Sequence, residues 1–534
     1  MQNIFRFQRL SFIVLLLLIV AYPINQAVAG TKTFIKEYTF QAGDEDSKNS
    51  SRVIALREVK RLLLEELGTY LESTTEVRNF QLSKDQILTL SAGIVQTELI
   101  EEKWDGKTYW LKAKISADAD GVVRAIDVLR KNREKTQELE AMRRKSDELL
   151  GEVERLRREM AAQNGGREGR KAAYDASIRQ LAAAEWIEKG HAVSGPRDDF
   201  QAAFEAYSRA IELDPANMQA YYFRARISEK NRALSDYYKI LSLAAKTSEE
   251  HLIRAWTYKE LEKRDAALSE FGQAIEKAAG NREKAAAYFD RGRYYFLFRP
   301  RPYVTGSGED IPNALELSLG DFNQAIALDP TDPSYFHNRA NILLALGRYD
   351  AAISDLSAGL KIDPQSAGLY SARGQAYQFM KKDELAVADL SRAIELEGPD
   401  HLFAAHDFML RASSYERMGK YDLALADWGI MAEKNPDNPY YLGEMSRLYV
   451  QTGKYDKAIQ SYSRVLALKP ESYLVRGAHY NRARAYALRG EAENAMQDLK
   501  KAIQLDAGYR NDARKDAAFA SLRHRPDFSA LVGK

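Results

Sequence analysis

Thr331 to Pro364 reads TDPSYFHNRANILLALGRYDAAISDLSAGLKIDP, a block of 34 residues. Two more blocks of this length, Gln365–Gly398 and Asp437–Pro470, repeat its pattern of bulky, small and turn-forming residues. If Phe336 is counted as position 4, the small and turn positions 8, 15, 20 and 32 hold Ala340, Gly347, Ala352 and Pro364. Self-similarity at a fixed period is typical of repeat architectures. We therefore predict an array of stacked helical hairpins.

The pattern extends over residues 177–507 as about nine units. The unit that ends at Pro436 carries Ala412, Tyr415, Gly419, Tyr421, Ala424 and Trp428 in register. This region resembles the tetratricopeptide repeat family. The resemblance implies helix-turn-helix units that stack into an α-solenoid, because one hairpin cannot bury its own apolar face. It also implies that the array binds proteins or peptide segments.

Charged residues recur within the units at positions 7 and 23. Two units lack the arginine at position 7, with Gly190 and Met445 there, and the same two lack the acid, with Ala206 and Ser461 at position 23. This joint loss predicts an ion pair within each of the other units, because the planar fork of an arginine matches a carboxylate. The predicted pairs are Arg224–Asp236, Arg254–Glu270, Arg291–Asp321, Arg339–Asp355, Arg373–Asp389, Arg411–Asp427 and Arg482–Asp498.

The resemblance also places a partner-binding groove on the first helix of each unit, chiefly at positions 2, 5, 9 and 12. These positions are polar and aromatic here, which favours a peptide or protein segment as the ligand. A set of groove lysines and asparagines for a peptide C-terminus is not found. The candidate groove residues are His337, Asn341, Gln375, Gln378, His406, Glu416, Tyr440, Arg447, Tyr480 and Arg484.

Residues 31–120 predict a small α/β domain of order β-α-α-β-β. Residues 33–40 alternate as a strand does, and helical periodicity follows from Ser51. Ser83 and Gln86 form a capping-box pattern for a second helix. Residues 95–104 and 108–115 then predict two strands joined at Asp105-Gly106, a pair typical of a type I′ turn.

Residues 121–163 predict a coiled-coil-like connector helix. Apolar residues, with one serine, follow a heptad seam: Leu139, Met142, Ser146, Leu149, Val153, Leu156 and Met160. Residues 139–160 could form a homodimer through this seam, or the helix could pack on its own chain. Asn164-Gly165-Gly166 should break the helix, and 164–176 is predicted as a linker.

The first residues, 1–29, follow the pattern of a secretory signal peptide. Arg6 and Arg9 precede a short apolar run, and Ala27-Val28-Ala29 offers a cleavage site before Gly30. The pattern predicts an extracytoplasmic, periplasmic protein. An uncleaved anchor is the alternative, although the apolar run is shorter than the roughly 20 residues that span a bilayer.

Composition excludes several kinds of function. The chain has 534 residues, no cysteine and a formal net charge of +2. It therefore has no disulfide or thiolate site, and its balance of charge argues against nucleic acid as a partner. The seven histidines form no H-E-x-x-H pair, and no nucleophile elbow or glycine-rich nucleotide loop occurs. We predict a protein that is not an enzyme and has no cofactor or metal.

Two further segments flank or interrupt the array. Residues Arg299–Leu315 form an insertion in the fourth unit, where a long loop is either functional or a tolerated excursion. Residues 508–534 carry an apolar stripe and are predicted as capping helices. The predicted function is an envelope scaffold or adaptor; a structural homo-oligomer or a glycan-binding protein are the alternatives.

Overall fold

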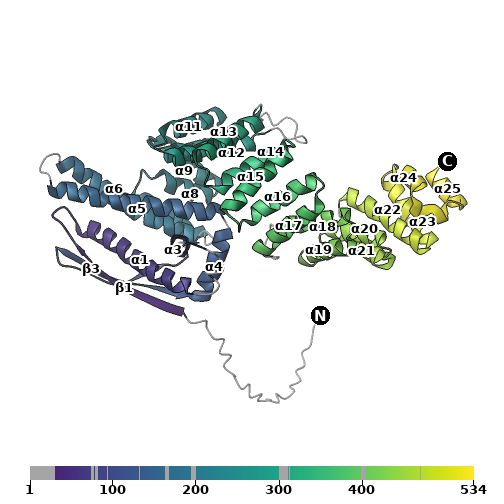
Figure 1. The fold of residues 1–534 in the computed structure, drawn as a ribbon, viewed down its shortest axis with the longest axis horizontal. Coiled ribbons are helices and arrows are strands. Elements are labelled where there is room, and N and C mark those ends of the chain that lie inside the picture. The colour runs from purple at the N-terminus through teal and green to yellow at the C-terminus, as the bar shows by residue number, and fades with distance from the viewer. Residues whose placement is uncertain are drawn as a thin grey trace, which may run out of the picture. The chain divides into compact units, whose positions relative to one another are not determined.

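The computed structural model describes residues 31–73, 77, 82–92, 94–131, 133–162, 167–193, 200–299, 311, 313–398, 404–468 and 471–533. The predicted signal peptide, its cleavage point and most of the Arg299–Leu315 insertion lie outside these residues. The chain divides into two compact units, Met1–Glu229 and Lys230–Lys534 (Figure 1). Each has its own secondary structure and core.

The N-terminal unit combines three strands with a series of helices. Its elements are β1 (Thr31–Gln41), α1 (Lys48–Glu72), α3 (Lys84–Ala92), β2 (Thr97–Trp104), β3 (Thr108–Asp118), α4 (Ala119–Lys131), α5 (Arg133–Ala162), α6 (Arg167–Val193), α7 (Phe200–Leu213) and α8 (Met218–Arg226).

The predicted strand and helix order of the small domain is confirmed. The sheet is antiparallel with strand order β1-β3-β2. Helix α1 packs on β1 and β3 and buries Val59, Leu63 and Leu67 against the sheet. The capping box before α3 is confirmed too, because the Gln86 amide donates to Ser83 Oγ and the Ser83 amide donates to Gln86 Oε1.

The turn between β2 and β3 differs from the prediction. Gly106 has φ +96°, and neither Asp105 nor Lys107 has a positive φ. A type I′ turn needs positive φ at both central residues, so that prediction was wrong. The Asp105 amide bonds to the Thr108 carbonyl at 3.3 Å, which makes Gly106 and Lys107 the central pair. A glycine at the first central position and a negative φ at the second are typical of a type II′ turn.

The predicted connector of residues 121–163 is two helices, α4 and α5, that complete the core of the N-terminal unit. The seven seam side chains from Leu139 to Met160 are all buried inside their own chain, among them Val153 and Leu156 in the core formed by the sheet and α1. The second predicted arrangement, a helix packed on its own chain, is the one observed. The seam therefore offers no exposed apolar stripe for a homodimer.

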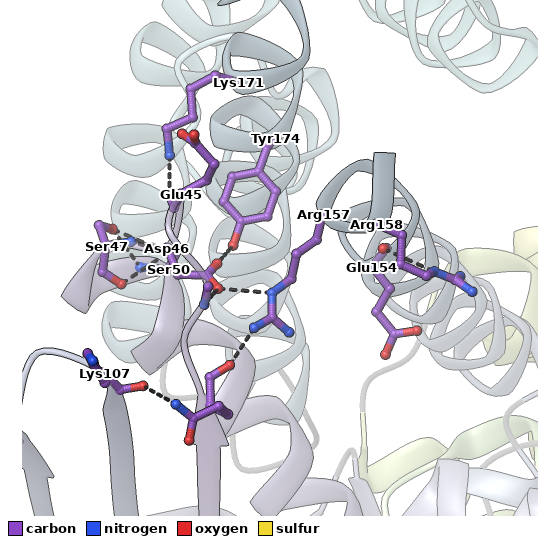
Figure 2. A network of polar contacts seen from close by, with 12 residues as sticks. Glu45, Asp46, Ser47, Ser50, Lys107, Glu154, Arg157, Arg158, Lys171 and Tyr174 are labelled. Carbon is purple, nitrogen blue, oxygen red and sulfur yellow. Dashed lines mark hydrogen bonds and ion pairs between the residues drawn. The ribbon is translucent and has the colours of Figure 1, made fainter. Parts of the chain in front are cut away.

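The predicted linker of 164–176 is wrong for most of its length, because α6 begins at Arg167. Tertiary contacts explain this early start. Tyr174 is buried, and its hydroxyl donates to Asp46 in the loop between β1 and α1. Figure 2 shows Asp46 between Tyr174 and Arg157, with Arg157 Nε 2.9 Å from Asp46 Oδ2. The loop is thus tied to both α5 and α6.

The C-terminal unit is entirely helical within the described residues. Its elements are α9 (Lys230–Ser242), α10 (Ser248–Glu260), α11 (Arg264–Lys277), α12 (Asn281–Leu297), α13 (Ala314–Leu328), α14 (Pro333–Ala345), α15 (Tyr349–Ile362), α16 (Ala367–Phe379), α17 (Asp383–Glu397), α18 (Ala404–Arg417), α19 (Tyr421–Lys434), α20 (Pro439–Gln451), α21 (Tyr455–Ala467), α22 (Ser472–Arg489), α23 (Ala492–Leu505), α24 (Tyr509–Lys515), the 3₁₀ helix η1 (Ala517–Leu522) and α25 (Pro526–Val532).

Consecutive helices of this unit pack as hairpins, from α10 with α11 to α22 with α23. Alanines at positions 8 and 20 are fully buried at the crossing, for example Ala340 and Ala352. The turn between paired helices has a residue of positive φ at position 15, such as Gly347 (+71°) and Gly453 (+73°). Glycine suits that conformation because it lacks a Cβ. The 34-residue period therefore reflects close helix contact and one left-handed turn residue.

The array ends in short helices that cover its last hairpin. Phe519, Leu522 and Phe528 are buried in one cluster with Ala483 and Leu499 of that hairpin. They come from η1 and α25, so residues 508–533, the described part of the predicted cap, cover the array, with a 3₁₀ turn in place of a regular helix. Across the described part of the chain, none of the helices has the length and apolar character needed to cross a membrane.

Candidate functional site

Arginine and carboxylate side chains meet within the hairpins of the C-terminal unit. The closest nitrogen–oxygen distances are 2.6 to 2.9 Å for Arg254–Glu270, Arg291–Asp321, Arg339–Asp355, Arg373–Asp389, Arg411–Asp427 and Arg482–Asp498. In the five aspartate pairs, Nε and Nη2 donate to separate carboxylate oxygens. We call each such pair a rung. Arg224 belongs to the N-terminal compact unit and Asp236 to the C-terminal one, so the pairing of these two residues stays a prediction.

Four of the six rungs also reach position 25 of the preceding repeat, which the sequence reasoning missed. Nη1 of Arg373 donates to Ser357 Oγ at 3.1 Å, and Nη1 of Arg411 donates to Ser391 Oγ at 2.9 Å. The same contact joins Arg339 to Asn323, Arg482 to Ser463 and Arg224 to Ser208. These acceptors all stand at position 25 of the repeat before. Such a rung therefore braces two helices of one repeat and links it to its neighbour.

The side chains of a rung are largely shielded from solvent. The five aspartates are buried, and neighbouring side chains partly cover their arginines. The Arg411 guanidinium, for example, lies 5.3 Å from the centre of the Phe408 ring. Burial raises the pKa of Asp321 and Asp427, and the arginine of each pair opposes that shift. The hydrogen bond to Asp321 raises the pKa of Arg291. Breaking a partly buried pair should therefore cost more than breaking an exposed one.

The ladder of rungs is interrupted at the hairpin of α20 and α21. Met445 replaces the arginine and joins an apolar cluster, and Ser461 replaces the acid and donates to the Leu442 carbonyl at 3.2 Å. The acceptor position of the preceding repeat is also lost, because Gly429 stands there. The arginine and the acid of a rung are thus absent together, as expected if they act as a pair.

A second, exposed set of ion pairs joins adjacent repeats. An acid in the first turn of the second helix meets a basic residue of the next repeat or of the cap, for example Glu316 with Arg348 at 3.0 Å and Asp422 with Lys454 at 2.8 Å. Arg525 meets Glu493 at 2.9 Å, and Arg489 pairs with Asp456. Because these acids are largely exposed, such pairs add little stability. The recurring acid at position 18 was the signal for them in the sequence.

The candidate groove residues fall into four groups. His406 and Tyr440 are exposed, and His337, Asn341 and Gln375 are half-buried. Four others bind neighbouring repeats or the cap: Gln378, Glu416, Arg447 and Arg484. Tyr480 is buried, which contradicts its assignment to the groove.

The cap explains the position of Tyr480. Its ring stacks on Tyr509 at 4.5 Å and its hydroxyl donates to Asp516 Oδ2 at 3.1 Å. Arg484 Nε lies 2.7 Å from the same carboxylate. In the last hairpin, therefore, the positions that would line a groove hold the cap in place.

Glu416 joins two repeats at the interruption of the ladder. It lies 2.5 Å from Arg447 of the next repeat, and the Trp428 indole donates to its other oxygen at 3.3 Å. The exposed Tyr440 ring lies 5.9 Å from the Trp428 ring. Charged and aromatic surface thus lie together at the repeat that lacks a rung.

Family models match much of the C-terminal unit. Models described as "TPR repeat" or "Tetratricopeptide repeat" match residues 322–354, 340–380, 367–400, 409–473 and 444–510. The helical hairpins, buried alanines and left-handed turns recur through these residues. This chain is a tetratricopeptide repeat protein.

Solved structures similar to this tetratricopeptide protein share low identity with it. They include YrrB, described as a TPR protein with an unusual peptide-binding site, at 22% identity over 36% of this chain and 98% of its own, with TM-score 0.32. A tetratricopeptide repeat protein from Parabacteroides merdae has 17% identity over 50% of this chain and 97% of its own, with TM-score 0.35. PilF of Pseudomonas aeruginosa has 16% identity over 44% of this chain and 99% of its own, with TM-score 0.34. No curated protein matches the chain.

The tetratricopeptide array also has an aromatic and cationic segment that the sequence reasoning missed. Arg293 lies 5.7 Å from the Trp256 ring and 5.8 Å from the Phe289 ring. Trp256 and Arg293 occupy position 9 of their repeats, and Phe289 occupies position 5, so the groove positions themselves were the signal. Such an arginine can stack with an aromatic ring or bind a carboxylate of a ligand.

The described residues contain no group of three or more His, Cys, Asp or Glu placed to hold a metal ion. Two histidines contact acids as parts of rungs, whereas His191 Nε2 lies 3.3 Å from Glu138 in the N-terminal unit. His251 Nδ1 lies 2.7 Å from Glu270 and His479 Nδ1 lies 2.8 Å from Asp498, each beside the arginine of that rung. The most regular charges of the array therefore brace it.

Proposed function

We propose that the protein is an extracytoplasmic scaffold or adaptor whose repeat array holds segments of other proteins. Tetratricopeptide repeats generally bind protein or peptide partners. We further propose that partners bind in the groove along the first helices of the repeats, from α10 to α20, and that the protein lies in the cell envelope.

One observation carries the choice of surface. The regular charges at positions 7 and 23 are used within the array, whereas His406 and Tyr440 on the first helices are exposed. Arg293 adds a cation flanked by Trp256 and Phe289. A surface of mixed polar and aromatic side chains fits a peptide segment, because aromatic rings and arginine supply much of the binding energy at protein interfaces.

The envelope location rests on the sequence of residues 1–29, with its basic start, apolar run and Ala27-Val28-Ala29 site. Fusion of alkaline phosphatase to Lys534 tests it, since that enzyme needs disulfides that form outside the bacterial cytoplasm. We expect phosphatase activity from the fusion and none when residues 1–29 are deleted. Fractionation of the fusion would then separate a cleaved, released protein from a membrane-anchored one.

Site-specific photocrosslinking tests the use of the groove. A photoreactive phenylalanine analogue replaces His406 or Tyr440 in the full chain in its native host, and Lys361, an exposed residue on the second helix of its repeat, is the control position. We expect protease-sensitive adducts from positions 406 and 440 and none from position 361. Adducts that contain only sugar polymer would support the glycan-binding alternative, and no adduct at either groove position would contradict the proposal.

A further inference from the structure

The two edges of the N-terminal sheet differ in how they are protected. The edge strand β2 has an irregularity between Leu99 and Glu101 and carries Glu98, Glu101, Glu102 and Lys103. Bulges and charges are devices that stop an edge from pairing with another strand. The opposite edge strand, β1, pairs with β3 without interruption from Thr31–Asp118 to Gln41–Thr108. Within the described residues, β1 is therefore the long and regular edge.

The hydrogen-bond pattern shows which groups of β1 face outward. The Ala42 amide donates to the Lys107 carbonyl at 2.8 Å, in register with the ladder between β1 and β3. Because bonded pairs alternate in an antiparallel ladder, the even-numbered residues of β1 bond to β3. The amides and carbonyls of odd-numbered residues such as Thr33, Ile35 and Glu37 then point to the free edge. The carbonyl of Gln41, also odd-numbered, accepts from Arg157.

A cleft of about 760 Å³ lies along β1. Lys32, Phe34 and Lys36 of β1 line it, together with residues of α1 and α3, and none of its described lining residues belongs to β2 or β3. It therefore lies on the open side of β1. Its apolar surface comes from Phe34, Leu62, Tyr70 and Leu88, so a side chain of an added strand could be buried there.

The charges in the cleft are unevenly paired. Its three acids each have a basic partner, Glu65 with Arg61, Glu66 with Lys36 and Asp85 with Arg143, at 2.6, 2.9 and 3.7 Å. Lys32 and Lys84 form no ion pair with a described carboxylate; the Lys32 ammonium instead lies 3.8 Å from the centre of the Tyr70 ring. The cleft thus has two cations left to meet acidic groups.

We propose that an extended, acidic segment of a partner protein binds along β1 as a fourth strand. Its main chain would bond to the outward groups of Thr33, Ile35 and Glu37. One apolar side chain would enter the cleft beside Phe34 and Tyr70, and acidic side chains would meet Lys32 and Lys84. Main-chain bonds supply affinity in such strand addition, and pockets for alternate side chains supply specificity. This surface is separate from the repeat groove.

Peptide selection on the full chain provides a probe. A phage-displayed library of random twelve-residue peptides is selected against the full-length protein, and dissociation constants of the selected synthetic peptides are measured by fluorescence anisotropy. We expect peptides in which apolar residues alternate with polar or acidic ones. The proposal would be overturned if the selected peptides lack that alternation, or if none of the variants described below changes their dissociation constants.

A proline variant tests the main-chain pairing. Ile35→Pro removes an outward amide but no bond to β3, and Ile35→Thr is the matched control because it keeps the amide and a β-branched side chain. We expect Ile35→Pro to weaken peptide binding at least roughly tenfold and Ile35→Thr to leave it within about twofold. Circular dichroism checks that the proline variant is folded. Equal binding by both variants would contradict strand addition.

Charge reversal tests the cleft independently of the backbone. Lys84 is exposed, so Lys84→Glu should not disturb folding, and Lys107→Glu is a control of equal charge change at the β-hairpin turn. We expect Lys84→Glu to weaken binding of acidic peptides several-fold, more at low salt, and Lys107→Glu to have a smaller effect. Equal losses in the two variants would contradict use of the cleft. Sedimentation that shows a dimer abolished by Ile35→Pro would identify a second copy as the occupant and also overturn the proposal.

Discussion

Buried charge is organised differently in the N-terminal unit and in the repeat array. In the N-terminal unit, Glu188 of α6 is buried and meets two cations of α1, Lys60 at 2.5 Å and Arg57 at 3.2 Å. In the array, each rung has one arginine and one carboxylate, as in Arg411 and Asp427 at 2.7 Å. Among the described residues, the first arrangement occurs once, whereas the second recurs from repeat to repeat.

The difference shows how each region obtains a defined structure. Glu188 and Asp46 connect helices to parts of the chain more than 100 residues away in sequence, so their loss should affect the whole N-terminal unit. A rung connects residues 16 apart in most repeats and touches only the preceding repeat. Since each repeat of a solenoid contacts only its neighbours, loss of one rung should stay local.

The largest effect is expected from Glu188→Ala. It leaves Lys60 buried without its carboxylate, and breaking a buried pair in this way costs about 3–5 kcal/mol. Hydrogen exchange measured by mass spectrometry should show faster exchange across α1 and α6. Glu185→Ala, on the same helix but in a more exposed pair with Lys189, is the control. Exchange that changes equally in both variants would contradict a central role for Glu188.

A smaller and local effect is expected from Asp427→Ala. The arginine left behind is partly exposed, so the cost should lie between those of exposed and buried pairs, about 2 kcal/mol. Exchange should rise in α18 and α19 and stay unchanged in α22 and α23. Asp422→Ala, an exposed acid on the same helix, should leave exchange unchanged. Faster exchange throughout the array would show that the repeats are more strongly coupled than we propose.

The hairpin that lacks a rung allows the reverse test. Met445→Arg alone should destabilise it, because an apolar contact is lost and a charge is added without a partner. Adding Ser461→Asp should recover about 1 kcal/mol as a coupling energy between neighbouring residues. A double-mutant cycle on exchange in α20 and α21 measures this energy. Coupling near zero would mean that backbone geometry at this repeat differs from that of its neighbours.

The smallest effect on stability is expected from a change of pH. Burial alone would raise the pKa of Glu188, but Lys60 and Arg57 outweigh it and the pKa is lowered. Its stabilisation is therefore complete above the ordinary glutamate value of about 4.3 and is lost as pH falls below it. The pKa of Asp427 is raised by burial, so its contribution is largest at low pH and declines as pH rises through the folded value.

Two neutral variants separate these contributions. The stability difference between wild type and Glu188→Gln should shrink as pH falls from about 6 to about 3, and the difference for Asp427→Asn should not shrink. Urea dependence of exchange in α6 and α19 provides the measurement. Parallel pH dependence of the two differences would contradict the assigned directions.

The repeat array was predictable from sequence because its geometry is local. Two helices that cross at Ala340 and Ala352, and turn at Gly347, need the same residue types in every copy. The rungs could be inferred from the joint loss of arginine and acid at Met445 and Ser461. Their contact with position 25 went unnoticed, because serine, asparagine and glycine all occur there.

The groove was predicted less completely. Position in the repeat identifies His406 and Tyr440 as exposed, yet the same positions at the end of the array, Tyr480 and Arg484, serve the cap. Only the neighbours of a residue distinguish these two uses. The aromatic segment around Arg293 shows the same limit, since it depends on which rings lie beside the arginine.

In the N-terminal unit, strand alternation and the Ser83–Gln86 cap were enough to predict strands and helices, because these are short-range patterns. The heptad from Leu139 to Met160 correctly marks a buried face, but periodicity does not say what buries it. The sheet, α1 and α6 fill that role within one chain, and Asp46 and Glu188 acquire their partners only when distant segments meet. Contacts between residues far apart in sequence have no repeating pattern. Only the tertiary structure therefore decided what buries the heptad face and which residues pair with Asp46 and Glu188.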